Sequence, residues 1–212
     1  GIVTNRHKKA NLGYSTTSLI MGSRELYDFV HMRTGVQMRP SSYTNSAETV
    51  RKNSPFVSVN TALGVDLFGN VWADFIELRR YYGGGGGQPD FIRALNDRIY
   101  GTPIIAMRSI TAKGQSKSSK HSPPGINLTA CSYDWVVIVT EWGTADLREM
   151  TVGEKALALA SISHPRFRDE LLRYVVDDPM FTKPVERSRT GFGEILPSGL
   201  RGSNKNQILR AV

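Results

Sequence analysis

Two features of this 212-residue chain carry residue types suited to chemistry: a run of five glycines at residues 83–87, and Glu141, which directly follows an apolar segment. An ordered glycine run loses maximal conformational entropy, and the usual reason to order one is close approach of backbone N–H groups to a ligand. Pro89 and Asp90 come next and are typical of a first helical turn, whose amides favour anions. The run therefore predicts a loop that faces a phosphate or a developing oxyanion. The alternative is a flexible linker, which would have more polar neighbours.

Glu141 ends the segment 134–140, which is almost continuously apolar and predicts a central strand. Ligand sites of open α/β sheets lie at the carboxyl ends of strands. We therefore expect Glu141 to be a partly desolvated carboxylate with a raised pKa, or to orient a catalytic group. The alternative is a structural hydrogen-bond acceptor.

Composition limits the class of protein. The formal net charge is +8 and the sequence pI about 9.7, which favours polyanionic partners such as nucleic acid, an anionic membrane or a phosphate-rich cofactor. The single cysteine, Cys131, excludes an intrachain disulfide framework and a multi-cysteine metal site, and we interpret it as a core residue. No segment reaches the roughly 18 to 20 apolar residues of a membrane span. We expect a soluble cytoplasmic protein without a metal.

The elements that position these residues follow from apolar periodicity. Strands are expected over residues 18–22, 36–39, 56–63 with a continuation through 65–67, 71–76, 103–107 and 134–140. Helices are expected over residues 24–32, 46–52, 90–100, 152–163 and 166–176. Alternating strands and helices indicate an α/β fold, with one domain over residues 1–176. Residues 177–212 are rich in Pro, Gly, Ser and Arg and predict an extended C-terminal arm.

Several motifs stand in a specific order. They are SVNTALGVDLFGNV at 58–71, GGGQPDFIR at 85–93, DWVVIVTEWGTADLR at 134–148 and SHPRFRDEL at 163–171, preceded by GIVTN at 1–5 and MGSRELYDF at 21–29. In order and spacing they resemble the carboxy-terminal half of the acetyl-CoA hydrolase/CoA-transferase family. The likeness covers about residues 1–175 and is far more specific than a lone glycine pattern.

The resemblance implies a NagB/RpiA/CoA-transferase-like fold, an open sheet flanked by helices. It implies a reaction in which a glutamate attacks an acyl-CoA thioester and the acyl group passes to a carboxylate or to water. Backbone amides of Gly85, Gly86 and Gly87 are then expected to stabilise the oxyanion, with Glu141 as a further catalytic residue. Coenzyme A is a substrate, and no other cofactor is implied. The family's nucleophilic glutamate precedes the segment that resembles residues 1–5, so we expect the isolated chain to be inactive.

The resemblance also suggests which side chains contact the substrate. We expect CoA or acyl contacts from Asn45, Asn60, Gly84, Gln88 and Lys113. Asn60 could instead be a satisfied core side chain, and Asn45 is the weaker candidate. Lys113 and the basic loop 113–124 could hold CoA phosphates, although a solvated charge run is the alternative. His164 is expected to cap a helix rather than to catalyse.

The implied partners are acyl-CoA, a carboxylate acceptor or water, and an amino-terminal half-domain or second subunit in a homo- or hetero-oligomer. An apolar patch near residues 83–87 and Glu141 is expected on this basis. Two other functions stay open: a non-catalytic CoA-binding or regulatory half-domain, and a basic nucleic-acid-binding module, for which no recognisable signature occurs. A nicotinamide-cofactor enzyme is disfavoured, because no strand with an acidic end follows the glycines at the required distance.

Overall fold

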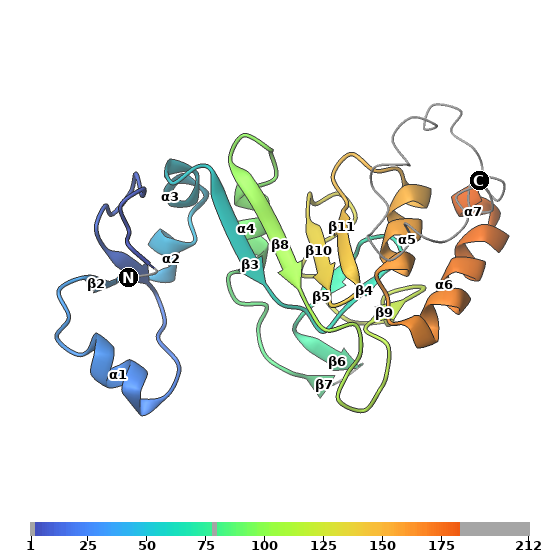
Figure 1. Ribbon diagram of the computed structural model, residues 1–212, viewed down its shortest axis with the longest axis horizontal. Coiled ribbons are helices and arrows are strands. Elements are labelled where there is room, and N and C mark those ends of the chain that lie inside the picture. The colour runs from blue at the N-terminus through green and yellow to red at the C-terminus, as the bar shows by residue number, and fades with distance from the viewer. Residues whose placement is uncertain (1–2, 78–79, 183–212) are drawn as a thin grey trace.

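The fold is built on a mixed four-stranded sheet. A computed structural model of the chain describes residues 3–77 and 80–182 (Figure 1). The strand order is β11-β10-β8-β3. The parallel neighbours are β3 (Phe56–Asn60), β8 (Gly101–Ala106) and β10 (Val137–Thr140), and β11 (Gly143–Asp146) runs antiparallel beside β10. Because parallel strands share a direction, the carboxyl ends of β3, β8 and β10 lie at one edge of the sheet.

Helices and small sheets surround this centre. Figure 1 shows α4 (Gln88–Ala94) behind β3 and β8, and α5 (Val152–Ser161) and α6 (Pro165–Asp177) beside β11. A second sheet has the order β5-β4-β9, and a hairpin joins β6 to β7. The bounds of these strands are β4 Gly64–Asp66, β5 Val71–Trp72, β6 Phe75–Glu77, β7 Arg80–Tyr81 and β9 Ser118–Ser119. The remaining elements are β1 (Ser15–Thr17), α1 (Arg24–Val30), β2 (Val36–Met38), α2 (Ser41–Thr44), α3 (Ala47–Lys52) and α7 (Pro179–Thr182).

The main core lies between the sheet and α5. Ile105, Ile138 and Leu159 are fully or almost fully buried there, and burying an Ile or Leu side chain is worth about 1.5–3 kcal/mol. The helix α5 begins with a capping box, in which Thr151 and Glu154 satisfy each other's backbone N–H groups. The capping box therefore fixes where α5 starts, and burial of its apolar face fixes which side of the helix faces inward.

One face of the sheet is largely uncovered at β3. Val57 and Val59 are 61% and 66% exposed, whereas Ser58 between them is buried. Parallel sheets normally have both faces covered. The described residues before Val50 include no buried residue, and large apolar side chains there are exposed, namely Leu19, Met21, Leu26, Tyr27, Phe29, Met32 and Met38. The amino-terminal segment and this face of β3 thus lack a covering layer within the described residues.

The α/β class with an open sheet is confirmed, but several element boundaries were wrong. Residues 18–22 are not a buried strand: Leu19 and Met21 are 70% and 81% exposed, and β1 lies earlier in the chain. The strand expected over 71–76 is two strands, β5 and β6. The helix expected over 90–100 is α4, which begins and ends earlier.

The first residues of the expected C-terminal arm are helical. Asp177 ends α6, and residues 179–182 form α7. Phe181 of α7 is 7% exposed and packs on Phe68 and Tyr174. Burial of this aromatic ring explains why the segment folds onto the body. The remainder of the predicted arm, 183–212, lies outside the described residues.

Candidate functional site

The glycine loop 83–87 connects β7 to α4, and its glycines meet different steric requirements. Gly86 has φ +57°, a left-handed conformation that side chains other than glycine rarely adopt. An added Cβ would lie 2.9 Å from Thr129 Cγ2 at Gly85 and 2.6 Å from Asn45 Nδ2 at Gly87. Both distances are too short for a real carbon contact. Glycine is therefore required by packing at Gly85 and Gly87 and by backbone conformation at Gly86. These requirements argue against the flexible-linker interpretation.

The amides of this loop are available. Gly83 N donates to Asp74 O over 3.4 Å, and Gln88 N donates to Gly85 O over 3.3 Å. Within the described residues, no acceptor pairs with the N–H groups of Gly84, Gly85, Gly86 or Gly87. Gly84 and Gly86 are exposed, and Gly85 and Gly87 are half-buried. Four successive unpaired donors at the start of a helix form a site suited to an anionic oxygen.

Two of the predicted contact residues, Asn45 and Gln88, lie at this loop. Asn45 stands against Gly87 and donates from Nδ2 to Asp90 Oδ2 over 3.3 Å. Gln88 Nε2 donates to Thr61 O over 2.7 Å, and Thr61 follows Asn60, the last residue of β3. Gln88 is only 3% exposed, and its Oε1 has no partner among the described residues. The structure thus places Asn45 and Gln88 at the glycine loop, and Gln88 connects this loop to the segment that directly follows Asn60.

Glu141 lies at the same edge of the sheet, directly after β10, and is firmly held. Its Oε2 accepts from Ser109 N over 2.9 Å and its Oε1 accepts from Ser109 Oγ over 2.8 Å. Trp142 Nε1 donates to the same Ser109 Oγ over 3.1 Å. The side chain is exposed rather than desolvated.

The pKa of Glu141 is lowered, so the expectation of a raised pKa was wrong. The small amount of burial raises it, but hydrogen bonds from the backbone of Glu141 and from Ser109, together with the charge of Arg108, outweigh this. Hydrogen bonds to the ionised form stabilise it. Glu141 is therefore an anchored carboxylate at neutral pH, which fits an orienting or structural acceptor better than a proton donor.

The basic loop is a short hairpin with two different lysines. Lys113 is exposed near its tip, where Gly114 N donates to Thr111 O over 2.9 Å. Lys117 returns to the site: its Nζ donates to Ala62 O over 3.0 Å. Burial lowers the pKa of Lys117, and the nearby charge of Glu141 opposes that shift in part. Sequence reasoning treated Lys117 only as one member of a charge run, and no local signal distinguishes it from Lys113.

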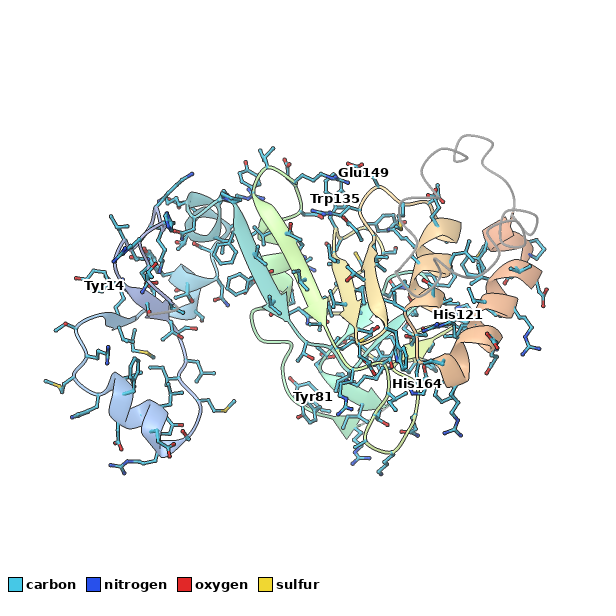
Figure 2. All side chains as sticks on the ribbon, in the orientation of Figure 1. Tyr14, Tyr81, His121, Trp135, Glu149 and His164 are labelled. Atoms are coloured by element: carbon cyan, nitrogen blue, oxygen red, sulfur yellow. The ribbon has the colours of Figure 1, made fainter. Side chains whose placement is uncertain are left out.

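Other predicted residues are structural. His164 Nδ1 accepts from Arg166 N over 3.2 Å, which confirms its role as a cap of α6. Its ring meets Trp142 edge-on at 5.6 Å. Figure 2 shows His164 and Tyr81 toward the end of the molecule to which the parallel strands point, with Trp135 at the opposite end. Cys131 is half-buried rather than a full core residue.

The described ranges contain neither a metal-binding cluster nor a membrane-spanning helix. No group of three or more His, Cys, Asp or Glu side chains there is arranged to hold a metal ion. Across residues 3–77 and 80–182, none of the helices is both long and apolar enough for a membrane span.

Comparison with known proteins identifies the family of the chain. Residues 22–175 match the model of the family described as acetyl-CoA hydrolase/transferase C-terminal domain. The 4-hydroxybutyrate coenzyme A transferase of Clostridium kluyveri is 36% identical over 175 residues, which are 81% of this chain and 40% of that protein. The acetyl-CoA hydrolase of Yarrowia lipolytica is 25% identical over 182 residues, which are 79% of this chain and 32% of that protein.

Solved structures show the same relationship. RipA from Yersinia pestis superimposes with a TM-score of 0.74 at 33% identity, over 82% of this chain and 39% of that chain. A 4-hydroxybutyrate CoA-transferase from Porphyromonas gingivalis gives a TM-score of 0.67 at 33% identity, over 82% and 40% of the two chains. The fold and these matches thus define a domain of the CoA-transferase class. The chain belongs to the acetyl-CoA hydrolase/transferase C-terminal domain family. It spans about 40% of the length of the first relatives that it matches.

Proposed function

We propose that this chain is the carboxy-terminal part of an acyl-CoA hydrolase or CoA transferase, and that its glycine loop binds the thioester oxygen. The observation that carries the proposal is the series of four unpaired N–H groups from Gly84 to Gly87, beside the carboxyl end of β3. When a carboxylate attacks a thioester carbonyl, negative charge develops on the carbonyl oxygen. Preorganised amides stabilise that charge, and losing one such donor typically lowers turnover about 10²- to 10³-fold.

The remaining residues are assigned by their positions around the loop. Asn45 and Gln88 lie at the glycine loop, and Asn60 directly precedes the segment that Gln88 contacts. We assign these three residues to the acyl and pantetheine part of the substrate. Lys113, exposed on the hairpin, is assigned to the CoA phosphates. Glu141 orients the turn at Ser109, since both of its oxygens accept from that residue.

The nucleophilic glutamate is assigned to an amino-terminal half-domain or a second subunit. Two observations support such a partner. The matched relatives are about two and a half times as long as the region that they share with this chain. The exposed face of β3 and the segment before Val50 have no covering layer among the described residues. Exposed apolar surface also occurs near the glycine loop, at Tyr81 and Tyr82, which are 61% and 70% exposed. Such patches are typical of interfaces.

Turnover measurements test the proposal directly. The purified chain is assayed for consumption of an acyl-CoA other than acetyl-CoA, such as propanoyl-CoA, with acetate or water as acceptor, alone and after assembly with the amino-terminal half of a complete enzyme. We expect turnover only from the assembly. In the assembly, Gly86→Val should reduce turnover about 10²- to 10³-fold while CoA binding suffers less. An added Cβ at Gly86 meets no atom within 4 Å, so its side chain would enter the open space over the loop.

Matched outcomes separate the alternatives. Turnover by the chain alone, abolished by changing one of its own carboxylates, would overturn the assignment of the nucleophile to a partner. An assembly that binds CoA without turnover would indicate a regulatory half-domain. For the partner surface, Val59→Ser should weaken association with the amino-terminal half, whereas Val152→Ser, an exposed position on α5, should not. Equal effects of the two substitutions would exclude β3 from that interface.

A further inference from the structure

Lys117 joins the two halves of the candidate site. Its backbone N–H donates to Ser109 O over 2.9 Å, and Ser109 in turn holds both oxygens of Glu141. Its Nζ donates to Ala62 O over 3.0 Å, two residues beyond the end of β3. Lys117 therefore contacts both Ala62, which follows β3, and Ser109, which holds Glu141 at the end of β10.

The segment beyond β3 is held from two directions. Thr61 O accepts from Gln88 Nε2 over 2.7 Å, and the next carbonyl, Ala62 O, accepts from Lys117. The first contact comes from the helix that follows the glycine loop, and the second from the basic hairpin. This arrangement places a half-buried ammonium at the same edge of the sheet as the unpaired loop amides.

The ammonium has donors to spare. A lysine side chain carries three N–H donors, and Ala62 O accounts for one of them. Burial penalises the charged form, which lowers the pKa of Lys117, and an anion beside it would offset that penalty. Arg108, another cation near Glu141, is exposed. Arg168 is half-buried, but it lies over the Trp142 ring and donates to Ser163 O. Lys117 is thus a partly desolvated cation at this edge, while Glu141 is already held by Ser109.

We propose that Lys117 binds the carboxylate that receives CoA, while the original acyl group leaves as its free carboxylate, and so favours transfer of CoA to a carboxylate over hydrolysis. The inference rests on the proposed function, because it assigns a substrate group to the same site. The chemistry that it names is a small monocarboxylate such as acetate, seated between the basic hairpin and the segment that follows β3. A charged hydrogen bond of this kind is worth about a ten- to hundredfold change in affinity.

Lys155 provides a matched control. It is also half-buried, burial also lowers its pKa, and its Nζ also donates to a backbone carbonyl, Ser132 O, over 2.5 Å. Lys155 belongs to α5, and its Nζ donates to Ser132 O rather than to Ala62 or Ser109, the two residues that Lys117 contacts. The two lysines therefore have similar burial, the same direction of pKa shift and the same kind of hydrogen bond. They differ in that a carboxylate is expected to bind only at Lys117.

The first experiment needs neither turnover nor a variant. The 212-residue chain is labelled with a trace amount of an amine-specific acylating reagent, with sodium acetate or with sodium chloride at equal ionic strength, and each lysine is quantified by mass spectrometry. We expect acetate to protect Lys117 several-fold and to leave Lys155 unchanged. Equal labelling of Lys117 in the two salts would overturn the proposal. Equal protection of both lysines would also overturn it, since the effect would then be unspecific.

The second experiment uses the assembled enzyme and separates this inference from the proposed function. Lys117→Met should raise the KM for acetate about ten- to hundredfold with a much smaller change in the KM for acyl-CoA, and should shift products toward hydrolysis. Lys117→Arg should restore much of the acetate dependence, and Lys155→Met should behave like the parent. If the Lys117→Met assembly is active and its KM for acetate is unchanged, the role of Lys117 is refuted and the proposed function is not. A shift in the KM for acyl-CoA instead would assign the ammonium to a CoA phosphate. Inactivity of the parent assembly would refute the proposed function, and the labelling result would still decide whether Lys117 binds the carboxylate.

Discussion

The left-handed backbone of Gly86 can be tested with a pair of alanine substitutions in the glycine loop. Gly86 has φ +57° with no atom within 4 Å of an added Cβ, so Gly86→Ala is penalised by backbone conformation and not by a clash. Gly84 lies outside the left-handed region, and an added Cβ there meets only Tyr81 Oη at an ordinary 3.6 Å. Both substitutions remove a glycine from the unfolded chain, so that contribution cancels when the two variants are compared.

The difference between the variants therefore isolates the left-handed penalty, about 1–2 kcal/mol for an L-residue. Gly86→Ala should unfold about 2–8 °C below Gly84→Ala, given about 2–4 °C per kcal/mol for a chain of this size. Gly86→Asn should fall between them, because asparagine tolerates this conformation better. The assay is urea denaturation with matched m-values, supported by thermal melts. If Gly86→Ala were as stable as Gly84→Ala, the loop would not hold the described turn, and the aligned amides inferred from it would lose their basis.

Three further predictions concern the frame of the site. Gly101→Ala should destabilise the chain by about 2–5 kcal/mol in denaturant titration, because φ is +147° and the new Cβ would lie 1.8 Å from Phe56 O on the paired strand; near-parental stability would contradict the β3–β8 register. Thr151→Ala should cost about 1 kcal/mol through loss of the α5 cap, while Ser23→Ala, whose side chain makes no capping bond, should be near neutral. Burial raises the pKa of Asp146, but the adjacent guanidinium outweighs it and holds the pKa below its usual value, so its contribution to stability is present above about pH 4 and lost as pH falls further. The melting temperatures of Asp146→Asn and the parent should accordingly differ at pH 7, and the difference should shrink as the pH falls below about 4. A difference that does not change with pH would refute this account of Asp146.

Much of the central fold could be predicted from the sequence. The strands at 103–107 and 134–140 and the helix at 152–163 are long, apolar and bounded by turn or capping residues, so local signals and burial agree. The short run at 18–22 gave the opposite result. Leu19 and Met21 have no described partner to bury them, so their hydrophobicity did not produce a buried strand.

The sequence predicts where the glycine run and Glu141 lie in the fold, but it does not predict the direction of the pKa shift of Glu141. As the sequence predicts, the glycine run leads into a helix and Glu141 directly follows a central strand; their roles in a site stay predictions. The prediction of a raised pKa for Glu141 was wrong because the main hydrogen-bond partner of this side chain, Ser109, is 32 residues away in the chain. Lys117 was not singled out for the same reason, since its contact with Ala62 O spans 55 residues. Long-range pairings of this kind are set by topology and leave no local pattern.

The position of β3 at the end of the sheet also determines how the isolated chain should behave at high concentration. Its sequence, Phe-Val-Ser-Val-Asn, contains no charge, and Val57 and Val59 are both exposed. Within the described residues β3 has a neighbour on one side only, β8. Uncharged, β-branched edge strands are templates for pairing with other chains and are a source of aggregation. Preparations of the chain alone should therefore precipitate at concentrations that an assembled enzyme tolerates, and a charged residue at position 59 would improve solubility at the expense of assembly.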